Sequence, residues 1–98
     1  MHSKDSILHS IQLNRGRLHE LGVRSLALFG SYASGNATAQ SDLDFIVKLE
    51  KKTFDAYMNV KDYLETLLGK PVDLVLDGTV KPSLKDSIQK TAVYVQGL

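Results

Sequence analysis

Two aspartates stand two residues apart in this sequence, Asp42 and Asp44, and a Gly-Ser pair precedes them. From Asp42 to Leu49 apolar and polar residues alternate, which predicts a strand with both carboxylates on one face. Their Cα atoms would lie roughly 6.5–7 Å apart. Carboxylates this close repel each other, so hydrogen bonds or a cation must offset the repulsion. An oxygen-rich site of this kind suits Mg²⁺, which keeps several waters and recruits substrate phosphates.

A third carboxylate, Asp73, stands between the apolar residues of a later predicted strand, Val72–Leu76. A charge in that position needs a partner. Asp73 would join Asp42 and Asp44 if the two strands are neighbours in the sheet. Three carboxylates on adjacent strands can hold two ions roughly 3.5–4 Å apart, the spacing of two-metal phosphoryl chemistry.

The Gly-Ser pair, Gly30-Ser31, ends a predicted buried strand, Ser25–Phe29. Glycine lets the backbone pass close to a phosphate, and a serine hydroxyl with the free N–H groups of a helical turn would bind its oxygens. Tyr32 could stack on a base. Taken singly, a Gly-Ser pair is usually only a turn, Asp-x-Asp at a strand start usually caps a turn, and a tyrosine usually packs. Together, these residues describe a site for a nucleoside triphosphate with Mg²⁺.

The elements that must position these residues follow from periodicity. Their predicted order is helix, strand, turn, strand, helix, strand, helix, which indicates an α/β or α+β fold: a small mixed sheet of three or more strands with helices packed on it. The first helix carries Ile7, Leu8, Ile11, Leu18 and Leu21, is interrupted at Asn14 and stops at Gly22. The second begins at a Thr53 cap, carries Phe54, Tyr57, Met58, Leu64, Leu67 and Leu68, and stops at Gly69. The last runs from Ser83 to Gln96, with Leu84, Ile88, Ala92 and Val95 at helical spacing.

Composition narrows the class of protein. A chain of 98 residues predicts a single domain, 1–98. The formal net charge of +1 argues against a general nucleic-acid or membrane binder, and no apolar run approaches the ~20 residues of a membrane span. Absence of cysteine excludes disulfides and thiolate metal sites and fits a cytoplasmic location. The three histidines, His2, His9 and His19, lack metal-ligand spacing.

These residues form a recognisable pattern. Leu28-Phe29-Gly30-Ser31, ten intervening residues and Asp42-Leu43-Asp44 resemble the Gly-Ser-x10-Asp-x-Asp signature of the DNA polymerase beta-like nucleotidyltransferase superfamily. The small size, the Ser41-Asp42 lead-in and the later strand with Asp73 resemble its minimal nucleotidyltransferase (MNT) branch. The similarity runs from the first helix to Lys81-Pro82-Ser83-Leu84.

The resemblance implies the polymerase beta-like nucleotidyltransferase fold and a set of roles. Asp42 and Asp44 would bind two Mg²⁺ ions, and Asp73 would be the third carboxylate, aiding the metal that activates the acceptor hydroxyl. The expected nucleotide-binding set is Gly30, Ser31, Tyr32, Ser34 and Ser41. The implied reaction transfers a nucleoside monophosphate, usually AMP from ATP, to a hydroxyl and releases pyrophosphate.

The resemblance also implies a partner. MNT proteins of this size are often encoded beside a HEPN-domain protein, and the pair behaves as a toxin–antitoxin system. The MNT protein is then the antitoxin and adenylylates a tyrosine of the HEPN toxin. Whether this chain forms a homo-oligomer or a hetero-oligomer stays open.

One position departs from the family pattern. Many relatives read Gly-Ser-x-Ala-Arg-Gly, whereas this chain has Ser34 where that arginine would fall. An arginine offers phosphate a charged fork and a serine only a hydroxyl, so triphosphate affinity would fall unless Lys48 or Lys70 substitutes. Two alternative functions therefore remain: a non-catalytic antitoxin that masks its HEPN partner, and a transferase acting on a small molecule or an RNA end.

Overall fold

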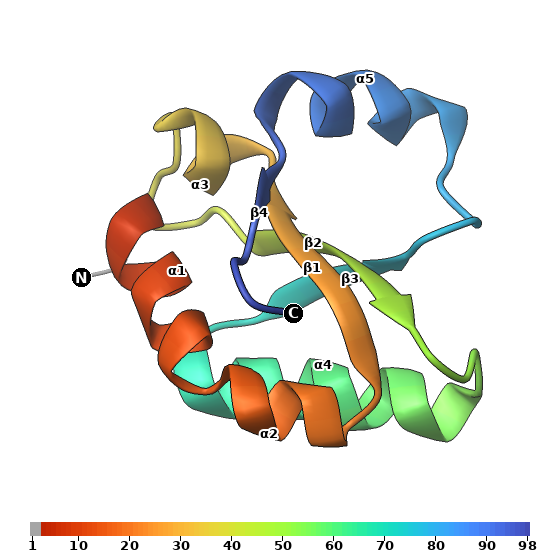
Figure 1. The fold of residues 1–98 in the computed structure, drawn as a ribbon. Coiled ribbons are helices and arrows are strands. Elements are labelled where there is room, and N and C mark those ends of the chain that lie inside the picture. Colours follow the sequence, from red (N-terminus) through yellow and green to blue (C-terminus); the bar gives the residue numbers. More distant parts are fainter. Residues whose placement is uncertain (1–2) are drawn as a thin grey trace.

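The computed structural model describes residues 3–98, so His2 lies outside the described residues. Within them, four strands form one mixed sheet in the order β3-β2-β1-β4 (Figure 1). β1 is antiparallel to β2 and β4, and β2 is parallel to β3, which confirms the predicted mixed sheet. The elements are α1 (Lys4–Leu13), α2 (Arg15–Glu20), β1 (Val23–Phe29), α3 (Ser31–Ser34), β2 (Leu43–Leu49), α4 (Phe54–Leu68), β3 (Val72–Leu76), α5 (Pro82–Thr91) and β4 (Val93–Tyr94).

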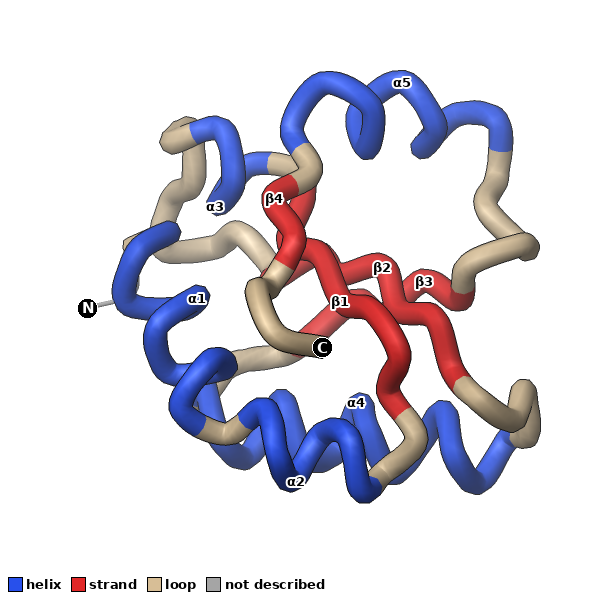
Figure 2. The backbone as a smooth tube through the Cα atoms, viewed as in Figure 1, coloured by secondary structure: helices blue, strands red, loops and turns tan. Residues whose placement is uncertain are grey.

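The helices cover the two faces of the sheet unequally. α1, α2 and α4 lie on one face, and α5 lies on the other (Figures 1 and 2). The main core joins side chains of the first face, such as Leu26 and Phe45, to Ile11 and Leu64 of the helices. A smaller cluster on the α5 face is built on Ala27, Phe29 and Ile46. The alternation predicted from Asp42 to Leu49 is confirmed, because its odd-numbered apolar residues all face the main core: Leu43, Phe45, Val47 and Leu49.

The predicted first helix is two helices that meet at Asn14. The Asn14 side-chain amide donates to the Ser10 carbonyl at 2.7 Å, and its backbone ends α1 and begins α2. Ile7, Ile11 and Leu18 are buried as expected. No helix within residues 3–98 is long and apolar enough to cross a membrane.

The connection from β2 through α4 to β3 follows the predicted signals, with two exceptions on the apolar face of α4. Thr53 caps α4 by accepting from the Ala56 N–H, and Gly69 ends it in the left-handed conformation at φ 66°. Val60, which is absent from the predicted set, is fully buried. Phe54, which is in the predicted set, is 76% exposed. It occupies the first position of α4, whereas the buried residues of that helix lie in its later turns.

The predicted last helix is wrong beyond Thr91. α5 ends there because Ala92 is extended, with ψ 128°, and Val93–Tyr94 pair with β1 as strand β4. The Val95 N–H donates to the Leu26 carbonyl at 2.9 Å, and the Val95 side chain enters the main core. Backbone pairing along the edge of β1 and burial of a β-branched side chain outweigh the helical spacing of this segment.

Candidate active site

The sheet brings two of the predicted carboxylates into one row. Asp44 on β2 pairs in register with Phe29 of β1 on one side and with Asp73 of β3 on the other. The two aspartates therefore sit on adjacent parallel strands and on the same face of the sheet, the face that α5 covers. Asp42 stands one residue before β2 and is exposed. The condition under which Asp73 was predicted to join the pair, that β2 and β3 are neighbours, is met.

The surroundings of Asp44 disfavour its charged form. Partial burial, followed by the negative charges of Asp73 and Asp42, raises the pKa of Asp44 to about 6. Within residues 3–98, no three Asp, Glu or His side chains converge closely enough to enclose a cation by themselves. A pair of carboxylates in register, Asp44 and Asp73, is still compatible with Mg²⁺, which takes its remaining ligands from water and substrate phosphate.

Gly30, in the Gly-Ser pair, packs directly against Asp44, in the Asp-x-Asp pair. Its backbone adopts φ 78° and ψ −149°, a conformation that favours glycine. A Cβ atom at this position would also overlap the Asp44 carboxylate. Gly30 is therefore required both by its own backbone and by the side chain packed against it.

One contact at Gly30 was not predicted. The Gly30 N–H donates to Thr91 Oγ1 at 2.8 Å, and that hydroxyl donates to the Ser87 carbonyl at 2.6 Å. Thr91 lies 61 residues from Gly30 and ends α5. No local motif marks a contact over this separation, and the helical spacing of the last segment predicts a helix that continues past Thr91.

The predicted nucleotide-binding serines lie in or beside the segment between β1 and β2. Ser31 is half-buried and begins α3. The Ser34 hydroxyl donates to the Ser31 carbonyl at 3.3 Å and accepts from the Asn36 side-chain amide at 3.2 Å. Ser41 Oγ accepts from the Thr38 N–H at 2.9 Å. The hydroxyls of Ser34 and Ser41 thus shape the turn, and a role for them in binding nucleotide stays a prediction.

Tyr32 is a core residue in this structure. It is 8% exposed and belongs to the main core, so it packs, as a tyrosine usually does. A role for Tyr32 in binding nucleotide stays a prediction. The Lys70 ammonium lies 5.9 Å from the centre of its ring and donates to the Ala39 carbonyl at 3.3 Å. Lys70 is thus placed beside the Gly-Ser segment. Lys48, the other suggested substitute for the missing arginine, lies further along β2 opposite Ser25.

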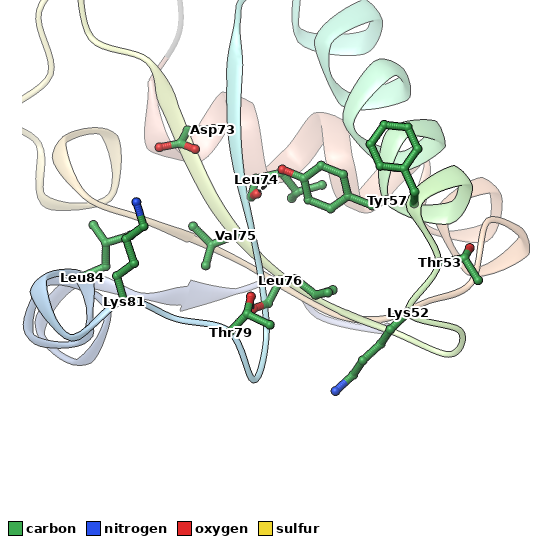
Figure 3. A pocket seen from close by; sticks show the side chains of 11 residues that line it. Lys52, Thr53, Tyr57, Asp73, Leu74, Val75, Leu76, Thr79, Lys81 and Leu84 are labelled. Carbon is green, nitrogen blue, oxygen red and sulfur yellow. Dashed lines mark hydrogen bonds between the residues drawn. The ribbon is translucent and has the colours of Figure 1, made fainter.

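A groove of about 510 Å³ opens beside Asp73. It runs along β3, between the start of α4 and the start of α5 (Figure 3). Asp73 and Lys81 lie toward one end of it and Lys52 toward the other. Among the described residues, neither lysine forms an ion pair. An open space of this size next to a carboxylate could admit part of a substrate.

Comparison with known proteins shows what this arrangement belongs to. The family described as nucleotidyltransferase domain matches residues 11–95, nearly the whole chain. The chain belongs to this nucleotidyltransferase family. It is 37% identical to the protein adenylyltransferase MntA of Thermococcus cleftensis over 75 residues, and the aligned region covers 76% of each of the two chains. A predicted protein adenylyltransferase of Methanocaldococcus jannaschii is 43% identical over 75 residues, 74% of this chain and 76% of its own.

Solved structures place the nucleotidyltransferase in the minimal branch. A structure described as a minimal nucleotidyltransferase superposes with a TM-score of 0.77 and 28% identity, over 94% of this chain and 95% of its own. A toxin–antitoxin MntA–HepT structure gives a TM-score of 0.57 and 21% identity, over 89% and 73% of the two chains. At that identity the second likeness shows a shared fold.

Proposed function

We propose that this nucleotidyltransferase transfers AMP from ATP to a hydroxyl group in an Mg²⁺-dependent reaction. The observation that carries the proposal is the meeting of Asp44 and Asp73 on adjacent strands, with Asp42 next to them and Gly30 packed against Asp44. The names of the similar proteins, which are protein adenylyltransferases, support the same reaction class.

The chain's own residues have separable roles in this reaction. Asp42, Asp44 and Asp73 would hold Mg²⁺, and Asp44 must lose its proton to do so, which at pH 7 it has mostly done. Bound Mg²⁺ would neutralise triphosphate charge and lower the pKa of the acceptor hydroxyl. Gly30 would let the backbone approach the phosphates, and the Ser31 hydroxyl would donate to them. Lys70, beside the same segment, is the cation best placed to assist.

We infer that the acceptor is a tyrosine of a HEPN-domain protein and that the chain acts as an antitoxin. A structure described as a tri-AMPylated Shewanella oneidensis HEPN toxin in complex with MNT antitoxin shares the fold, with a TM-score of 0.58. That description applies to the Shewanella pair. It motivates the same proposal for this chain, whose exposed groove next to Asp73 leaves room for an acceptor supplied by a partner.

The test is to incubate the protein with the HEPN-domain product of a neighbouring gene, ATP and Mg²⁺, and to measure the intact mass of the partner. We expect additions of AMP that disappear in the double variant Asp42→Asn and Asp44→Asn, because a neutral amide is a poor Mg²⁺ ligand. Asp62→Asn, at an exposed position on α4, is the matched control and should retain transfer. A folded partner that gains no mass with the wild-type protein would contradict the proposal.

One observation favours a second function, non-catalytic masking of the partner. Ser34 stands in place of the common arginine, and its hydroxyl is already engaged within the turn. Masking predicts that the double Asp→Asn variant still suppresses the partner's toxicity when the two are co-expressed. Loss of suppression, with the complex still formed in a pull-down, would exclude masking.

A further inference from the structure

The hydroxyl of Thr91 is fixed as a hydrogen-bond acceptor for the glycine of the motif. Its single proton is committed to the Ser87 carbonyl, one turn back on α5, at 2.6 Å. Its oxygen accepts the Gly30 N–H at 2.8 Å. Both bonds are partly buried, where exchange with water competes less well than at the surface. The last turn of α5 is thereby tied to the loop that begins the Gly-Ser segment.

The Gly30 peptide is held from two sides. Thr91 binds its N–H, and the Asp44 carboxylate packs against its Cα, where a side chain would otherwise stand. The Gly30 carbonyl accepts the Ser34 N–H at 3.0 Å and so closes the turn of α3. A shift of the Gly30 peptide would therefore move the start of α3, including Ser31, relative to Asp44.

We propose that Thr91 is a positioning residue of the nucleotide site: its hydroxyl holds the Gly30 amide so that Ser31 and Asp44 keep the spacing that a metal-bound triphosphate requires. The nucleotide part of this inference rests on the proposed function, whereas the Thr91–Gly30 bond does not. One consequence is immediate. Because the Gly30 N–H is engaged by Thr91 and the Ser34 N–H by the Gly30 carbonyl, the donors of this segment left for phosphate lie at the start of α3, at Ser31 and the residues just after it.

The fold does not depend on this hydroxyl alone to hold the end of the chain. β4 pairs with β1 at Ala27 and Leu28, and the Val95 N–H donates to the Leu26 carbonyl. The Val95 side chain is also buried in the main core. Removal of the Thr91 hydroxyl should therefore leave the chain folded while it releases the Gly30 amide.

The experiment compares Thr91→Val, which keeps the shape and removes the hydroxyl, with Thr91→Ser, which keeps the hydroxyl. Amide hydrogen exchange at Gly30, followed by NMR on ¹⁵N-labelled protein, reads the bond directly. We expect exchange to accelerate about 10-fold in Thr91→Val and to stay near the wild-type rate in Thr91→Ser. Thr66→Val, on the exposed side of α4, controls for the loss of a threonine hydroxyl elsewhere.

The functional readout is transfer of AMP to the HEPN-domain partner at varied concentrations of ATP with Mg²⁺. Loss of one hydrogen bond should raise the KM for ATP about 2- to 10-fold in Thr91→Val, with a smaller change in kcat and recovery in Thr91→Ser. If Thr91→Val does not fold, Thr91→Ala removes the same hydroxyl without adding a methyl group.

The outcomes distinguish the positioning role of Thr91 from the proposed AMP transfer. Unchanged Gly30 exchange in the hydroxyl-free variant, or equal behaviour of Thr91→Ser and Thr91→Val, would overturn the positioning role. A KM for ATP that stays at the wild-type value while Gly30 exchange accelerates would overturn its link to nucleotide binding. Absence of AMP transfer by the wild-type protein would instead remove the proposed function, and the exchange rates would still decide whether Thr91 holds Gly30.

Discussion

Asp44 is held in surroundings that oppose its own ionisation. Its pKa rises from an ordinary 3.8 to about 6, so the folded chain binds this proton more tightly than the unfolded chain does. The associated stability is fully present below pH 3.8 and is lost as the pH rises through about 6. At neutral pH, without a cation, the ionised Asp44 therefore destabilises the fold, and carboxylates with raised pKa values cluster at functional sites.

Replacement of Asp44 by asparagine should stabilise the protein at neutral pH. Asn removes the charge that burial and the two neighbouring aspartates disfavour. After allowance for solvent screening we expect about 1 kcal/mol at pH 7.5, with a smaller effect at pH 5. Thermal unfolding in the presence of EDTA measures the difference. A variant less stable than the wild type at pH 7.5 would show that the carboxylate makes a favourable contact that outweighs the repulsion.

Gly30 offers a test that separates backbone strain from steric overlap. Gly30→Ala should destabilise the chain by about 2–4 kcal/mol, because it adds an overlap with Asp44 to the cost of a positive φ. Gly35→Ala is the matched control: its φ is 85°, but no atom lies within 4 Å of the added Cβ, so only the backbone cost remains. Urea unfolding of both variants gives the comparison, and equal losses would argue that Asp44 simply moves aside.

At the scale of elements, Glu65 ties α4 to the strand that carries Asp73. Its carboxylate accepts the Val72 N–H at 2.9 Å and pairs with Lys61 at 3.1 Å. The hydrogen bond from Val72, and then that from Lys61, lower the pKa of Glu65 below its ordinary 4.5. The position of β3 relative to α4 is thus fixed at the first residue of the strand.

Replacement of Glu65 by glutamine should lower the melting temperature at pH 7. A carboxylate with a lowered pKa contributes stability above pH 4.5, and that contribution disappears as the pH falls through the folded value. The gap between the variant and the wild type should therefore close in acid. Melting curves at pH 7, 5 and 3 check this. Glu20→Gln, at an exposed ion pair of 3.7 Å, should show little gap at any pH.

The elements that local patterns specify were predicted well. β3 has the predicted bounds, Val72–Leu76, and α4 begins and ends at its predicted Thr53 and Gly69 signals. Such features rest on residues close in sequence, namely a capping hydroxyl, a left-handed glycine and period-2 alternation. The pairing of Asp44 with Asp73 could be predicted only on the condition that β2 and β3 are neighbours. Strand order depends on which edge of β2 the chain returns to, and local patterns do not show this.

The features that long-range contacts decide were missed. The spacing of Ala92 and Val95 predicts helix where the chain forms β4, because the sequence does not show that an edge of β1 is free to pair with this segment. No sequence pattern points to Thr91, because it can accept from Gly30 only when α5 ends beside that residue.

At the scale of the whole molecule, the two faces of the sheet bury different amounts of apolar side chain. The three helices α1, α2 and α4 bury the main core, whereas α5 contains no fully buried residue. Mutations that reduce side-chain volume should therefore cost more on the first face. The residues after β4 pack on that face too, because the side chain of Val95 is buried in the main core.

This difference predicts unequal effects of two similar mutations. Val95→Ala should cost about 1–2 kcal/mol, because it leaves a space in the main core. Val80→Ala, at a half-buried position on the α5 face, should cost less than about 1 kcal/mol. Urea unfolding provides both values. Equal losses would indicate that the α5 face is packed as firmly as the main core.

The Tyr57 hydroxyl, which donates to the Leu74 carbonyl, also bears on how the protein behaves in concentrated solution. β3 is an edge strand, and an edge strand with open backbone groups can add a strand from another molecule and seed aggregates. Tyr57 occupies one of those groups, while at the opposite edge β4 offers only two residues. Both edge strands are therefore poor templates for pairing, β3 because the Tyr57 hydroxyl binds one of its carbonyls and β4 because it has only two residues. This would keep copies of the chain from pairing edge to edge.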